Sequence, residues 1–172
     1  MSNNKIIIIQ SQNDNEYKIG INQSFWCVCM FAINYEELRS LFLNNKEEFI
    51  NLYMKCLKEG TDNCKKDIND NIVINNTILF DKFNLSNKIF LTYEKKNLES
   101  MNDIKILTSY KFNIISCDCN SFILINIYGY FLVLNSQENI VQFIKDEDVF
   151  NYIKNKIDTV FNDSHITFYC CA

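Results

Sequence analysis

The chain has 172 residues, of which 48% are hydrophobic and 14% aromatic, and its formal net charge is -4. This length suits one domain with a complete core, and the composition excludes an intrinsically disordered chain. The acidic balance, without a cluster of basic residues, argues against a nucleic-acid binder and against a membrane-surface binder. We therefore expect a single globular domain over residues 1–172.

Few sequence markers of turns or targeting are present. With 3 Gly and no Pro, turns and left-handed positions must be filled largely by Asn, so one Asn carries little information. The apolar run 6–9 is too short for a signal-peptide core or a membrane span. We expect a cytoplasmic protein in a reducing compartment, where most of the eight cysteines are free thiols.

The N-terminal part predicts short strands followed by helices. Residues 5–11 and 17–21 are strand candidates, and 25–33 is a run of nine apolar residues. The periodicity of that run does not separate helix from strand, but both of its sides must be buried. Asn34 and Glu37 have the spacing of a reciprocal helix cap.

A second helix is expected to begin near Asn45. An apolar face at helical spacing predicts it, and Gly60 then stands where a left-handed C-cap is expected. Residues 61–70 are polar and predict a loop. The residues of the apolar face are Phe49, Leu52, Tyr53 and Cys56.

The second half of the chain is rich in predicted strands. The segments are 88–93, 105–115, 121–127, 130–135, 140–144 and 165–171, whereas 71–80 has mixed periodicity. Between the last two strands, Asp146 caps a predicted helix with Val149, Ile153, Ile157 and Val160 on one face. This order predicts an α+β domain with a mainly antiparallel sheet.

Metal and phosphate chemistry lack their usual residues. His165 is the only histidine, which argues against a zinc hydrolase, and no glycine-rich phosphate-binding motif occurs. Cys27 and Cys29, like Cys117 and Cys119, lack the two-residue gap typical of zinc sites. We expect no metal and no cofactor, with buried cysteines acting as small hydrophobic residues.

Three short segments carry a resemblance to a known family. They are "GINQSFWCVC", which opens the apolar run, "IVINNTILF" at 72–80 and "YFLVLNSQ" at 130–137. In this order the chain resembles the papain-like deubiquitinase domain of herpesvirus large tegument proteins and related OTU-like domains of viruses and mobile elements. The resemblance implies a papain-like cysteine-protease fold with a buried N-terminal helix.

The resemblance also implies that the catalytic residues have been replaced. Ser24 stands for the family's nucleophilic cysteine, Asn135 for its aspartate and Gln137 for its histidine, while the oxyanion donor Gln23 is retained. A thiol protease needs a thiolate, an imidazole and a carboxylate that orients it. We therefore expect Ser24 to face Asn135 and Gln137 across a cleft, in a pseudoenzyme that binds a protein partner, including a ubiquitin-like one.

Three alternatives remain open at this stage. In an unrelated α+β domain, Ser24 is an ordinary helix N-cap and Asn135 an ordinary turn residue. An active thiol hydrolase would use Cys27 as nucleophile and His165 as base. A self-assembling structural protein of a virus particle or inclusion would form homo-oligomers, in keeping with many aromatic residues, many thiols and low net charge.

Overall fold

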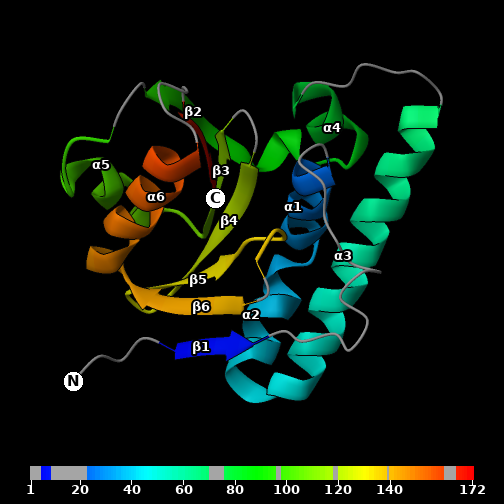
Figure 1. Ribbon diagram of the computed structural model, residues 1–172, viewed down its shortest axis with the longest axis horizontal. Coiled ribbons are helices and arrows are strands. Elements are labelled where there is room, and N and C mark those ends of the chain that lie inside the picture. The colour runs from blue at the N-terminus through cyan, green and yellow to red at the C-terminus, as the bar shows by residue number, and fades with distance from the viewer. Residues whose placement is uncertain are drawn as a thin grey trace.

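The computed structural model describes residues 5–8, 23–69, 76–95, 98–117, 120–138, 140–160 and 166–172. Through these residues runs one antiparallel sheet of seven strands, in the order β1-β6-β5-β4-β3-β7-β2 (Figure 1). The strands are β1 (Lys5–Ile8), β2 (Ile89–Lys95), β3 (Phe112–Cys117), β4 (Asn120–Ile127), β5 (Tyr130–Leu134), β6 (Ile140–Lys145) and β7 (Ile166–Cys171).

Helices cover both faces of the sheet, which confirms the predicted α+β class. Helices α1 to α4 pack on one face, while α5 and α6 pack on the other (Figure 1). Two 3-10 turns cover residues 86–88 and 106–109. The helices are α1 (Ser24–Ile33), α2 (Tyr35–Asn44), α3 (Lys46–Asn69), α4 (Asn76–Lys82), α5 (Asn102–Lys105) and α6 (Asp146–Val160).

Strand alternation divides the core into two apolar clusters. On β4 and β5, Ile123 and Leu132 belong to the cluster under α1, whereas Leu124 and Val133 belong to the cluster under α6. Successive side chains of a strand point to opposite faces. This alternation therefore also determines to which side of the sheet a side chain near the end of β5 points.

The apolar run 25–33 forms helix α1. Nine of its ten residues are buried, because α1 lies between the sheet and the long helix α3. A helix that is apolar on all sides is stable only when it is enclosed in this way. The run is therefore helical because the sheet and α3 enclose it, a choice between helix and strand that its periodicity did not determine.

The predicted helix end at Gly60 is wrong, because α3 continues to Asn69 through the segment expected to be a loop. A Cβ atom at Gly60 would lie 2.8 Å from both Cα and N of Cys27. The glycine therefore allows the backbones of α1 and α3 to approach closely, and its role is tertiary rather than local.

The predicted reciprocal cap at Asn34 is also wrong, although α2 does begin at the next residue. The Asn34 side chain makes no hydrogen bond to the start of α2. Its Nδ2 donates to the carbonyl of Met30 at 2.8 Å and to Sγ of Cys56 at 3.6 Å. Asn34 therefore joins the end of α1 to α3.

The strand predicted over 105–115 begins only at Phe112. Residues 102–109 are helical instead, and they bury Ile104 and Leu107 in the cluster under α6. The remaining strand predictions are confirmed within the described ranges. The predicted strand 17–21 lies outside the described residues, and so do 71–75 of the segment whose periodicity was mixed.

The hairpin between β4 and β5 turns at Tyr128 and Gly129, the two residues between the predicted strands 121–127 and 130–135. Both residues have positive φ, 48° and 83° respectively, which is typical of the two-residue turns that join twisted strands. An aromatic residue with positive φ is uncommon. The Tyr128 side chain is 80% exposed, so burial in the core does not account for it.

Candidate functional site

Ser24, the predicted remnant of the nucleophile, begins α1 and is fixed to the sheet. Its hydroxyl donates to the carbonyl of Ser121 at 2.9 Å and accepts from the backbone N–H of Ser121 at 3.0 Å. The side chain is buried. These two bonds hold the N-terminus of α1 against the start of β4 and occupy the hydroxyl as both donor and acceptor. Gln23 precedes α1 and makes no side-chain hydrogen bond that caps it.

A chain of hydroxyl and amide groups extends from this point. Oγ of Ser121 and Oγ of Ser116 are 3.1 Å apart, and Nδ2 of Asn76 lies 3.4 Å from Oγ of Ser116 and 3.1 Å from the hydroxyl of Tyr169. Burial raises the pKa of Tyr169 above its usual value. We call Ser24, Asn76, Ser116, Ser121 and Tyr169 the hydroxyl cluster. None of these five groups exchanges a proton near neutral pH.

Asn135 has a structural role at the end of β5. Its Nδ2 donates to the hydroxyl of Tyr152 on α6 at 3.3 Å, and its Oδ1 accepts from the backbone N–H of Gln137 at 3.1 Å. Its backbone carbonyl accepts from the hydroxyl of Tyr53 on α3 at 3.3 Å. The buried amide side chain thus closes the turn and bonds to α6, while the backbone carbonyl of the same residue bonds to α3.

The structure does not bring Ser24 to Asn135 or Gln137 as expected. Alternation along β5 directs Asn135 to the face of the sheet covered by α6, whereas Ser24 lies on the face covered by α1. Gln137 is exposed. The β5-end residue on the α1 side is Ser136, whose buried hydroxyl lies near the thiol of Cys27 and has no hydrogen-bond partner among the described residues. The expected meeting of Ser24 with Asn135 therefore does not occur, because Asn135 belongs to the opposite face of the sheet.

Cys27, the alternative nucleophile, lies one turn into α1 and is fully buried. Hydroxyl groups of Thr61 and Ser136 face the thiol, but burial is the larger influence and raises the pKa of Cys27 to about 12. The thiol is therefore protonated at neutral pH, whereas a nucleophilic cysteine needs a thiolate. His165, its expected base, lies outside the described residues.

The other cysteines of the described ranges show no ligand arrangement. The free, buried thiols are those of Cys27, Cys29, Cys56, Cys64, Cys170 and Cys171. Across the described residues, no group of three or more His, Cys, Asp and Glu side chains is placed to hold a metal ion.

In the same part of the chain, no helix has the length and apolarity to cross a membrane.

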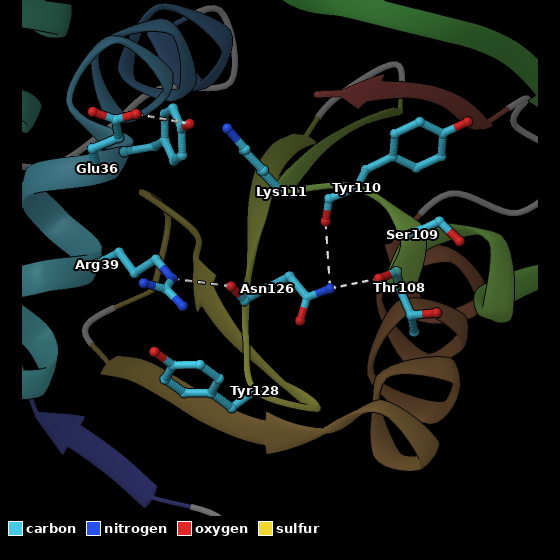
Figure 2. A pocket seen from close by; sticks show the side chains of 9 residues that line it. Glu36, Arg39, Thr108, Ser109, Tyr110, Lys111, Asn126 and Tyr128 are labelled. Carbon is cyan, nitrogen blue, oxygen red and sulfur yellow. Dashed lines mark hydrogen bonds between the residues drawn. The ribbon is translucent and has the colours of Figure 1, made fainter.

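A pocket of about 610 Å³ opens between α2, the β4–β5 hairpin and the 3-10 turn that precedes β3 (Figure 2). Its lining combines two cations, one carboxylate, three tyrosines and small polar groups. The lining residues are Tyr35, Glu36, Arg39, Thr108, Ser109, Tyr110, Lys111, Asn126 and Tyr128. The sequence analysis missed this site, because its residues come from separate segments and form no motif.

Hydrogen bonds fix the two central side chains of this pocket. Nε of Arg39 donates to the carbonyl of Asn126 at 3.4 Å, and the guanidinium carbon lies 5.0 Å from the centre of the Tyr128 ring. Nδ2 of Asn126 lies 2.7 Å from the carbonyl of Thr108 and 3.4 Å from that of Tyr110. These bonds hold the Arg39 and Asn126 side chains in place within the pocket.

No protein-family model matches this chain, and no curated protein or solved structure is similar to it at a significant level. A functional conclusion therefore depends on the chemistry of the described side chains.

The groups of the hydroxyl cluster can form hydrogen bonds but cannot accept a proton from a nucleophile. The pocket at Arg39 offers fixed charge and hydrogen-bonding groups, which suit binding.

Proposed function

We propose that this chain is a catalytically inactive, protease-like domain that binds a protein partner. The proposal depends mainly on one observation, the state of Ser24 at the start of the buried helix. Its hydroxyl is bonded to both backbone groups of Ser121 and lies among groups that do not titrate near neutral pH. Among the described residues, the side chains that continue this hydrogen-bonded chain offer no base, and an alcohol that no base deprotonates is a poor nucleophile.

The arrangement of elements supports the protease-like part of the proposal. A buried helix begins with Ser24 and packs on an antiparallel sheet, where it touches the start of β4. The β5 end, with Ser136, faces the next turn of that helix at Cys27. Cysteine proteases of the papain type also place their nucleophile at the start of such a helix, which is the feature that the resemblance implies.

Inactivity and binding are tested separately. We expect no labelling when the protein is incubated with a thiol-directed ubiquitin probe, because the buried Cys27 thiol is protonated. The Ser24→Cys variant is expected to stay unlabelled as well, since position 24 is buried and the described hydroxyl and amide groups linked to it are not bases. Labelling of the wild-type protein that disappears in Cys27→Ala would overturn the proposal.

The binding part is tested with ubiquitin itself. Adding the unlabelled chain to isotope-labelled ubiquitin is expected to shift a contiguous set of ubiquitin amide resonances. An unchanged ubiquitin spectrum would remove the ubiquitin-like partner from the proposal.

A second candidate function, self-association, is favoured by the edge strand β2. Phe90 and Leu91 on this strand are 75% and 38% exposed, and β2 pairs only with β7 in the described sheet. Exposed apolar edge strands are templates for pairing with another chain.

Light scattering is expected to show concentration-dependent dimers or larger species. Phe90→Lys should convert these species to monomer, whereas the control Lys55→Gln on α3 should leave the assembly unchanged. A monomer at all concentrations would remove this candidate.

A further inference from the structure

Arg39, in the pocket of Figure 2, is the only arginine among 17 basic residues of the chain. One of its donors, Nε, is bonded to the carbonyl of Asn126. Within the described residues the terminal guanidinium nitrogens have no hydrogen-bond partner, and no salt bridge there includes Arg39 or Lys111. The guanidinium is therefore anchored on one side, while no carboxylate of the described residues pairs with its charge.

The one carboxylate of the pocket is already engaged elsewhere. Oε1 of Glu36 accepts from the hydroxyl of Tyr35 at 3.2 Å. Figure 2 shows Glu36 and Arg39 on the same side of the pocket, where α2 carries both, but no salt bridge of the described residues joins them. With Arg39 and Lys111 against Glu36, the described lining carries one net positive charge, in a chain whose net charge is -4. Such a site attracts an anion.

Tyr128 adds an independent indication of function. The residue has a φ of 48° and is 80% exposed, so the turn holds a bulky side chain in an unfavourable conformation without burying it. Backbone strain of this kind is found at binding sites. Its ring lies beneath the Arg39 guanidinium, where it orients the cation and offers an aromatic wall to a ligand.

Asn126 supplies an acceptor beside the cation. Because Nδ2 donates to the carbonyls of Thr108 and Tyr110, the identity of the amide atoms is settled. Oδ1 then points away from those carbonyls (Figure 2). A ligand in this pocket would therefore lie next to a planar cationic donor, the Arg39 guanidinium, and a fixed acceptor, Oδ1 of Asn126.

We propose that this pocket binds a carboxylate of a peptide segment of the partner protein. The terminal nitrogens of Arg39 donate to the carboxylate, since guanidinium matches its planar geometry, and Oδ1 of Asn126 accepts a peptide N–H. This inference rests on the proposed function, because it assigns the binding surface and the partner chemistry of that domain. The carboxylate belongs either to a chain terminus or to an acidic side chain.

Three pentapeptides of otherwise neutral sequence distinguish these sources. One has capped ends and a central glutamate, one has a free C-terminal carboxylate, and one has capped ends and no charge. Titration of the isotope-labelled protein is expected to shift the amides of residues 39, 126 and 128 with one of the two carboxylate peptides. The uncharged peptide is expected to cause no saturable shift. Equal binding of all three peptides would overturn the proposal, as would binding of none.

Substitutions then test the assigned atoms. Arg39→Gln is expected to weaken binding roughly tenfold or more, as for loss of a charge-assisted hydrogen bond. Arg39→Lys, which keeps the charge without the planar group, should lie between this variant and the wild type. The control Lys55→Gln on α3, with its side chain 69% exposed, should leave affinity unchanged. An unchanged affinity of Arg39→Gln, with its fold verified by circular dichroism, contradicts the proposal.

Tyr128→Asn separates binding from folding. Asn tolerates the left-handed conformation better than Tyr, so the variant is expected to have an unchanged or higher melting temperature together with weaker peptide binding. Tyr128→Phe should preserve both. A Tyr128→Asn variant that binds like the wild type would show that the ring has no part in the site.

Failure of the pocket and failure of the proposed function give different results. If no peptide binds but ubiquitin binds the wild type and Arg39→Gln equally well, the partner surface lies outside this pocket. The proposed function then stands. Specific labelling of Cys27 by the ubiquitin probe removes the proposed function, whatever the peptides do.

Discussion

Gly60→Ala is expected to lower the free energy of unfolding by about 2 kcal/mol. The new Cβ would lie 2.8 Å from Cα and N of Cys27, and backbone atoms cannot rotate out of the way. Overpacking in a core costs up to about 3 kcal/mol or somewhat more, while alanine in place of glycine gains about 1 kcal/mol in helix propensity. The overpacking is the larger effect, so we expect α1 and α3 to be pushed apart with a net loss of stability.

Urea unfolding followed by circular dichroism measures this change, and Asn51→Ala on the exposed side of α3 is the matched control. That control should stabilise the protein by a few tenths of a kcal/mol, because only helix propensity changes there. Combining Gly60→Ala with Cys27→Ala should restore little stability, since the closest atoms belong to the backbone. Equal stabilisation by Gly60→Ala and Asn51→Ala would mean that α3 does not press on α1.

The same glycine shows where sequence reasoning succeeds and where it fails. The apolar face of α3 was predictable, because Phe49, Tyr53 and Cys56 repeat at helical spacing and are all buried. The continuation of the helix beyond Gly60 was not, since glycine serves equally as a C-cap and as a point of close approach. Only the position of α1, which is a tertiary property, separates the two roles.

Register sets a similar limit on site prediction. The strand 130–134 was predictable from its apolar residues, but their alternation assigns Asn135 to the α6 face and Ser136 to the α1 face. A shift of one residue reverses this assignment, and short motifs do not define it. The pocket at Arg39 lay beyond sequence reasoning altogether, because three separate segments bring together Arg39, Lys111 and Asn126.

Asn135→Asp is expected to destabilise the protein by about 3 kcal/mol at pH 7, the order of cost that an unpaired buried charge carries. Position 135 is 1% exposed, and Tyr152 links it to the carboxylate of Glu138. Both burial and this neighbouring carboxylate raise the pKa of a new aspartate in the folded state above its unfolded value of about 3.9. The variant should therefore lose stability as pH rises above about 4, and the loss should level off above the folded-state pKa.

Asn135→Ala provides the control without a charge. It loses the hydrogen bonds of the amide and is expected to cost about 2 kcal/mol, with the same difference from wild type at pH 4 and pH 7. An Asn135→Asp variant as stable as wild type throughout this range would mean that the end of β5 accepts a carboxylate. From the predicted loss at position 135, we therefore expect the triple variant Ser24→Cys, Asn135→Asp, Gln137→His to be less stable than the wild type. It should gain no proton-transfer site, because positions 24 and 135 lie on opposite faces of the sheet.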